Sequence, residues 1–171
     1  MAGAAKPVSL GNDVLVANDW GQVIRLNSQN GEVVWGVKTA RSQGSSLLAN
    51  MLDIDSEPLV VENDIYVASI TQGVSRLSTS GQLRWRKGAG NFAGLAYLNS
   101  TVISVEDEGR IVGLSAQDGQ EQWENRQLLG RGLTKPAVIG NRFVVGDFEG
   151  YIHLLEGGSG HLLGSTKVAN G

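Results

Sequence analysis

Residues 114–123 read LSAQDGQEQW, and looser copies of this stretch lie at 26–35 (LNSQNGEVVW) and 77–85 (LSTSGQLRW). Each copy has a leucine, then a glycine, and then a tryptophan four positions after the glycine. In a fourth copy the glycine is Gly160, and Gly164 stands where the tryptophan is expected. The four motif glycines are separated by 50, 38 and 41 residues, so the chain is built from internal repeats. The glycines and tryptophans of this motif are Gly31, Trp35, Gly81, Trp85, Gly119, Trp123 and Gly160.

Two further features recur at fixed places ahead of the motif. A second glycine in an apolar context precedes it in every copy, at Gly21, Gly73, Gly109 and Gly150. An asparagine follows five positions after the residue that opens each copy, and these opening residues are Pro7, Pro58, Gly94 and Pro136. Four copies that share this many offsets indicate a true repeat.

Within each repeat, apolar side chains alternate with others over short runs, as in VLVAND at 14–19 and IYVASI at 65–70. Such runs between glycine, asparagine and aspartate turns are typical of short antiparallel strands, and each repeat holds four of them. No segment keeps a helical period over about ten residues or more. We therefore predict an all-β chain of four four-stranded antiparallel blades of a β-propeller. The expected blades are 7–38, 58–88, 94–125 and 136–168.

The tryptophans call for two different interpretations. A large aromatic side chain at a fixed slot of a repeat normally fills the space between neighbouring sheets, so we assign Trp35, Trp85 and Trp123 to the core. Trp20 lies off this slot. An exposed aromatic side chain in a turn can anchor a protein partner, and Trp20 is therefore a candidate docking residue.

Composition excludes several classes of protein. The 171 residues carry 17 acidic and 14 basic side chains, with a net charge of −3 and no long block of either sign, so we expect no nucleic-acid partner. No cysteine is present, which excludes disulfides, thiolate metal sites and a cysteine nucleophile. No apolar run approaches the roughly 18 residues of a membrane span.

Signals for catalysis and metal binding are weak. The histidines are His153 and His161, and neither a His-x-x-x-His spacing nor a phosphate-binding glycine loop occurs. Asp53 and Asp55 have the spacing that opens a calcium loop, but Pro58 stands where that loop requires glycine. We predict no catalytic residue, no cofactor and no metal site.

The motif LSAQDGQEQW resembles the quinoprotein-type (PQQ-like) repeat, a class that includes quinone-dependent dehydrogenases and non-enzymatic scaffolds. Three longer stretches, at 53–61 (DIDSEPLVV), 128–138 (LLGRGLTKPAV) and 144–155 (VVGDFEGYIHLL), are similar to the C-terminal half of the BamB family. That family comprises outer-membrane lipoproteins of the β-barrel assembly machinery. The resemblance implies half of an eight-bladed ring, with the lipid anchor in the half that precedes Pro7.

The resemblance also implies a function and a place in the cell. It implies a non-catalytic scaffold that docks the periplasmic POTRA region of BamA and supports the folding of outer-membrane β-barrels, with nascent barrel proteins as further partners. The expected location is the periplasmic face of the outer membrane of a Gram-negative bacterium. One alternative is another propeller adaptor with a different partner. The other is a fragment of a quinone-dependent dehydrogenase, which the absence of the required vicinal disulfide disfavours.

The long loop at 36–57 is the main candidate site. It combines apolar side chains, Met51 and Leu52 among them, with the acidic pair Asp53 and Asp55, a combination that suits protein docking. From the residues alone, the two aspartates can equally form turns that lead into Pro58. The resemblance implies that Asp53 and Asp55 contact BamA, with Met51, Leu52, Arg131 and Trp20 as weaker candidates.

Other charged residues have simpler interpretations. Arg131, with Arg126 and Lys135, either faces a partner or belongs to a solvated loop between blades. Asp147 and Glu149 are expected to shape a tight turn before Gly150. The family's other docking element is a Leu/Arg-bearing loop just before the position of Pro7. Only 1–6 precede Pro7 here, so we expect that element to be absent.

An isolated half of a propeller leaves its two flanking blades uncovered. We expect the missing half-propeller, a fused partner or a second copy of the chain to cover them.

Overall fold

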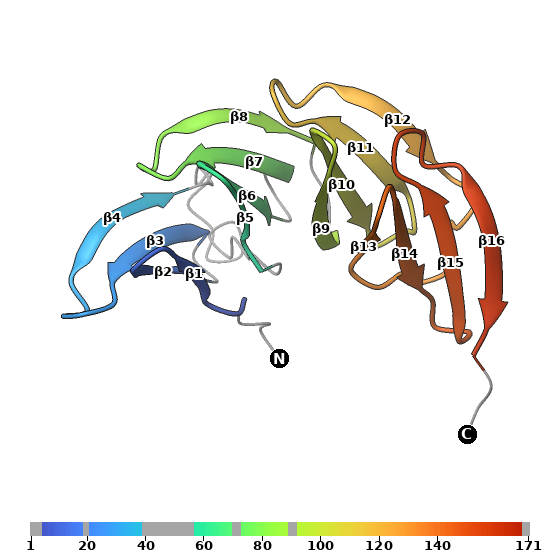
Figure 1. Ribbon diagram of the computed structural model, residues 1–171, viewed down its shortest axis with the longest axis horizontal. Helices are drawn as coiled ribbons and strands as arrows, with labels where there is room; N and C mark the ends of the chain where they lie inside the picture. Colours follow the sequence, from blue (N-terminus) through green and yellow to red (C-terminus); the bar gives the residue numbers. More distant parts are fainter. Residues whose placement is uncertain (1–4, 19–20, 39–56, 70–72, 89–91, 169–171) are drawn as a thin grey trace, which may run out of the picture. The chain divides into compact units, whose positions relative to one another are not determined.

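The described part of the chain consists of β-strands and the turns that join them. The computed structural model describes residues 5–18, 21–38, 57–69, 73–88 and 92–168. Strands β1 to β16 form four four-stranded sheets, in which all of the pairs are antiparallel (Figure 1). This confirms the predicted all-β fold of propeller blades. No helix long and apolar enough to cross a membrane is found in the described ranges.

Each repeat of the sequence forms one sheet, and we number these blades 1 to 4. Blade 1 contains β1 (Val8–Leu10), β2 (Asp13–Asn18), β3 (Gln22–Asn27) and β4 (Val33–Lys38). Blade 2 contains β5 (Leu59–Val61), β6 (Asp64–Ser69), β7 (Gly73–Ser78) and β8 (Leu83–Lys87). Blade 3 contains β9 (Phe92–Leu98), β10 (Thr101–Glu106), β11 (Ile111–Ser115) and β12 (Glu121–Asn125). Blade 4 contains β13 (Ala137–Ile139), β14 (Arg142–Gly146), β15 (Tyr151–Glu156) and β16 (Leu162–Lys167).

The leucine of the repeat motif marks a break in strand pairing. In every blade the register between the third and fourth strands shifts at this leucine, which is Leu26, Leu77, Leu114 or Leu155. A bulge of this kind places two residues of one strand opposite one of its neighbour and increases the local twist. The repeated motif therefore specifies a turn and also a stronger local twist between the third and fourth strands of each blade.

The chain divides into two compact units, Met1–Asn91 and Phe92–Gly171. In the first unit, side chains of blades 1 and 2 form one apolar core, which includes Leu15, Val23, Ile65, Val67 and Leu77. In the second unit, blades 3 and 4 form another core, which includes Ile103, Ile111, Phe143, Val145 and Leu155. Each core lies between two sheets, because alternate residues of a strand point to opposite faces.

Candidate functional site

Within each unit, the motif tryptophan of the first blade lies against the motif glycine of the second. Trp123 of β12 is paired in register with Gly113 of β11. A Cβ atom at Gly113 would lie 2.2 Å from the indole ring, and one at Gly160 of the next blade would lie 2.3 Å from it. The ring therefore occupies space that a side chain at either glycine would need.

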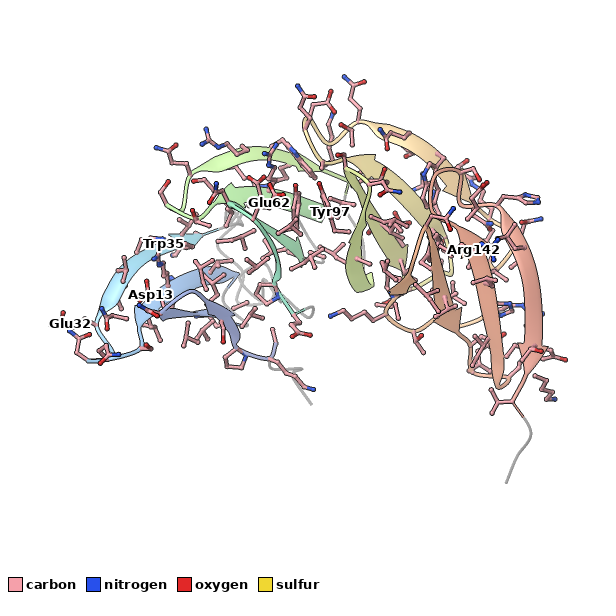
Figure 2. All side chains as sticks on the ribbon, viewed as in Figure 1. Asp13, Glu32, Trp35, Glu62, Tyr97 and Arg142 are labelled. Carbon is pink, nitrogen blue, oxygen red and sulfur yellow. The ribbon has the colours of Figure 1, made fainter. Side chains whose placement is uncertain are left out.

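The same arrangement occurs in the first unit. A Cβ atom at Gly81 of blade 2 would lie 2.9 Å from the ring of Trp35 in blade 1. The Trp35 Nε1–H donates a hydrogen bond to the carbonyl oxygen of Thr79, at 3.0 Å. Trp35 and Asp13, both labelled in Figure 2, belong to this first blade, where Asp13 forms an ion pair with Arg25 at 2.6 Å.

The remaining motif residues have local roles. Trp85 is almost fully buried, and its ring packs at a tilt against that of Tyr66, with 5.9 Å between the ring centroids. Gly31 and Gly119 have φ values of 74° and 73° in the turns that precede β4 and β12. These are left-handed conformations that glycine adopts without a steric penalty.

Arg131 ties the loop between β12 and β13 to the turn between β14 and β15. Its Nη1 donates hydrogen bonds to Asp147 Oδ2 at 2.7 Å and to Glu149 Oε2 at 2.9 Å. The side chain of Asp147 is fully buried, whereas half of the Glu149 side chain is exposed. Of the predicted docking residues, Arg131 is the one that lies among the described residues, and its charge is compensated within its own unit.

Asp147 is the centre of this network. Its Oδ1 accepts hydrogen bonds from the backbone N–H groups of Glu149 and Tyr151, at 3.0 and 2.9 Å, which confirms that it shapes the turn before Gly150. Burial of the carboxyl raises its pKa. Hydrogen bonds from Tyr151, His153 and Arg131 outweigh this effect, so the pKa of Asp147 lies well below its ordinary value.

His153 extends the network to the last strand. Its Nε2 lies 2.9 Å from Asp147 Oδ2, and its Nδ1 lies 2.7 Å from the hydroxyl oxygen of Ser165 on β16. The ring is buried and stacks on Tyr151, over which Arg131 also lies. A hydroxyl, an imidazole and a carboxylate in this order also form the catalytic triad of acyl-transfer enzymes. In such a triad Nε2 of the histidine faces the hydroxyl, whereas here Nδ1 of His153 faces the hydroxyl of Ser165. The Arg131 guanidinium also engages the same carboxylate oxygen. We interpret these contacts as structural.

A second ionic cluster lies in blade 3. Arg110 donates to Glu106, Glu121 and Glu124, each at 2.9 Å. Although burial lowers the pKa of Arg110, hydrogen bonds to Glu124 and Glu121 raise it above its ordinary value. Arg126, predicted to face a partner or solvent, is largely exposed and forms an ion pair with Glu124 at 3.1 Å. Through Arg110, which directly precedes β11, this cluster joins the end of β10 to β12.

The main predicted docking residues cannot be placed. Met51, Leu52, Asp53, Asp55 and Trp20 lie outside the described residues. In the part of the chain that the structure describes, no group of three or more His, Asp or Glu side chains is arranged to hold a metal ion. His161 is exposed in the turn before β16, where its backbone N–H donates to Ser159.

Sequence reasoning missed the roles of His153 and Ser165. One signal was available, because alternation along 151–156 places His153 on the same face as Leu155, which is fully buried. A buried imidazole needs polar partners. Nothing in the sequence pattern indicated that Asp147 and Ser165 supply them.

Comparisons with known proteins agree on one family. A family described as "Outer membrane protein assembly factor BamB" matches residues 1–94 and again 70–163. The protein of that name from Legionella pneumophila (strain Paris) is 32% identical over 169 residues, which are 98% of this chain and 44% of the relative. The crystal structure of BamB from Moraxella catarrhalis superposes with a TM-score of 0.88 at 29% identity, over 98% of this chain and 51% of that one.

A more distant likeness shows the fold alone. The structure of the quinohemoprotein alcohol dehydrogenase ADHIIG from Pseudomonas putida HK5 superposes with a TM-score of 0.73 at 14% identity, over 34% of its own chain. The chain thus spans about half, or less, of the length of the Legionella pneumophila protein, the Moraxella catarrhalis protein and the dehydrogenase.

Proposed function

The chain belongs to the BamB family of outer membrane protein assembly factors, and on this premise we propose that it is a non-catalytic docking scaffold of the β-barrel assembly machinery. One observation carries this function: the family matches along 1–163 of a chain whose described residues form propeller blades. Because the chain spans less than half the length of its curated relatives, it contributes part of the scaffold.

The mechanism is positioning. Because the faces of the sheets pack against one another, the loops between blades are the parts that are available to bind a partner. One of these loops is held firmly, because Arg131 links it to the buried carboxylate of Asp147. A loop that is already ordered loses less conformational entropy when it binds, which favours affinity.

The partner is BamA, and the chain binds the periplasmic POTRA region of BamA. The loop at 36–57 supplies the principal contacts, with Asp53 and Asp55 orienting the partner and Met51 and Leu52 adding apolar contact. Arg131 and Trp20 are secondary contacts. What supports this assignment is the family membership together with the acidic pair in the stretch DIDSEPLVV, one of the stretches in which the chain resembles the family.

The location follows from the same partner. The chain acts at the periplasmic face of the outer membrane of a Gram-negative bacterium, and the complete protein is held there by a lipid anchor. Folding barrel proteins are further ligands of the assembled scaffold.

The second candidate is a propeller adaptor of the PQQ-like repeat class with another protein partner. A quinone-dependent dehydrogenase is supported by the shared fold alone, at 14% identity to the alcohol dehydrogenase.

Calorimetric titration of the chain with the periplasmic region of BamA tests the proposed site. We expect saturable binding by the unaltered chain and loss of at least about tenfold in affinity for the double variant Asp53→Ala, Asp55→Ala. The matched control is Asp107→Ala, Glu108→Ala, which removes two exposed carboxylates from the turn before β11 and should bind normally. Equal affinity of the two double variants would refute the site, and no binding by the unaltered chain would refute the partner.

A further inference from the structure

Arg131 is held in place by one nitrogen of its guanidinium group. Nη1 donates to both Asp147 and Glu149, and the group lies over the ring of Tyr151, 5.7 Å from the ring centroid. Arg110, by contrast, engages carboxylates through Nε, Nη1 and Nη2. Among the described residues, no group accepts a hydrogen bond from Nε or Nη2 of Arg131, and neither atom belongs to the buried polar atoms that lack a partner.

The free edge of Arg131 suits a carboxylate. Nε–H and Nη2–H lie side by side in the plane of a guanidinium, and together they can donate two parallel hydrogen bonds to the oxygens of one carboxylate. The Arg131 side chain is 36% exposed, so a ligand can reach it. Because Nη1 already fixes the side chain, little conformational entropy is lost when a ligand binds.

An exposed aromatic side chain adjoins Arg131. Phe148 is 71% exposed, the largest exposed fraction of any large apolar side chain in the described ranges. Its backbone N–H donates to the carbonyl oxygen of Arg131, and its ring packs on Gly132, where a Cβ atom would lie 3.1 Å from the ring. Phe148 belongs to the turn whose backbone Asp147 fixes. A rigid exposed aromatic side chain of this kind can anchor a protein partner.

Blade 3 shows that this position of the turn faces solvent even where another blade follows. Asp107, which like Phe148 is followed by Glu-Gly, holds the same position in the turn before β11. The loop that leads to blade 4 lies against that turn, where the Gly130 N–H donates to the carbonyl oxygen of Glu108 at 2.7 Å. Asp107 is exposed nevertheless. The exposure of Phe148 therefore does not require the absence of a following blade.

We propose that Arg131 and Phe148 together bind a segment of the partner in which a carboxylate side chain stands next to an apolar one. The carboxylate takes the free Nε–Nη2 edge of Arg131, and the apolar side chain packs on the ring of Phe148. This inference rests on the proposed function, with the periplasmic region of BamA as the partner. The surface includes the loop that joins β12 to β13, and the loop at 36–57 joins β4 to β5 in the same way.

Charge complementarity favours this partner segment. Asp53 and Asp55 would attract basic groups of the partner, whereas Arg131 accepts an acidic one. A partner that must offer both charges is held in one orientation, and a partner that lacks either charge is rejected.

Glu149 opposes the incoming carboxylate. Its own carboxylate is half exposed and lies 2.9 Å from Nη1 of Arg131, so it repels a second carboxylate at the neighbouring edge of the same guanidinium. Removal of this charge by Glu149→Gln should therefore raise the affinity for the partner, by about twofold. A role of Glu149 in stability alone would leave the affinity unchanged.

Calorimetric titration of the full 171-residue chain with the periplasmic region of BamA tests the surface. Arg131→Lys keeps a positive charge that can pair with Asp147 but lacks the Nε–Nη2 edge, and we expect a loss of at least about fivefold in affinity. Phe148→Ala should lose a similar factor. The matched controls, Arg142→Lys and Ile139→Ala, make the same kinds of change at the other end of β14 and should bind normally, since both residues are exposed there.

The outcomes separate this inference from the proposed function. Arg131→Lys and Phe148→Ala chains that bind as tightly as their controls, or a lower affinity after Glu149→Gln, would overturn the inference alone. No binding by the unaltered chain would overturn both. Circular dichroism checks that each variant is folded; if Arg131→Lys is not, Phe148→Ala and its control Ile139→Ala decide the result.

Discussion

Gly160 of blade 4 lies directly against the indole ring of Trp123 in blade 3, so close that a Cβ atom on the glycine would come within 2.3 Å of the ring. Gly160 also has a φ of 66°, which L side chains rarely adopt. The glycine of one repeat thus leaves room for the tryptophan of the preceding repeat, and this contact joins the two blades of the unit.

Gly160→Ala should therefore destabilise the second unit. Overpacking and the left-handed backbone together predict a loss of about 2–4 kcal/mol in the free energy of unfolding. Urea denaturation followed by tryptophan fluorescence measures it. Gly158→Ala is the control, because no atom lies within 4 Å of a Cβ atom there, and it should cost less than about 1 kcal/mol. Similar losses for the two variants would contradict the packing role of Gly160.

Trp35→Phe and Trp123→Phe should differ in cost. The Trp35 Nε1–H donates to the Thr79 carbonyl, whereas Trp123 Nε1 is buried with no hydrogen-bond partner in the described structure. Replacing Trp35 loses a hydrogen bond and leaves an acceptor unpaired, while replacing Trp123 removes an unpaired donor. We expect Trp35→Phe to be more destabilising by about 1 kcal/mol in urea denaturation. The reverse order would show that lost packing outweighs the hydrogen bond.

The two acidic partners of Arg131 should contribute unequally to stability. The fully buried carboxylate of Asp147 accepts hydrogen bonds from Arg131, His153 and two backbone N–H groups, and Asp147→Asn weakens these bonds. We expect the free energy of unfolding, measured by heat or urea, to fall by about 2–3 kcal/mol. Glu149→Gln changes a half-exposed partner and should cost less than about 0.5 kcal/mol. Equal effects would mean that the buried carboxylate is not the centre of the network.

The Asp147 carboxyl should also make stability depend on acid pH. Its pKa in the folded chain lies below the ordinary value, so the unfolded chain takes up the proton first as the pH falls. The stabilisation is complete above about pH 4 and declines as the pH falls through about 4 toward the lower folded-state pKa. We expect the unaltered chain to lose more stability than Asp147→Asn between about pH 5 and 2.5. Parallel curves for the two proteins would contradict this linkage.

The sequence was sufficient to predict the blades because each repeat carries its own signals. The offset from Gly81 to Trp85 recurs, and short alternating runs such as IYVAS at 65–69 lie within strands. Local patterns of this kind determine which residues pair and which face the core.

The polar network of blade 4 could not be predicted in the same way. Asp147, His153 and Ser165 belong to a turn and two strands, and the contacts arise from strand register and burial rather than from a spacing in the sequence. The bulge at each motif leucine was also missed, since a two-residue alternation gives no indication of where pairing shifts. Docking by the loop at 36–57 was predicted from its length and composition, and it remains a prediction, as do the roles of Asp53 and Asp55 within it.

Docking to BamA is tested most directly by competition. Labelled BamB of Legionella pneumophila is bound to the periplasmic region of BamA, and the unlabelled chain is added over a wide range of concentrations while the anisotropy of the label is recorded. We predict complete displacement of the labelled protein at saturating concentrations of the chain. An unchanged anisotropy at saturating chain would contradict docking to BamA at the family's site.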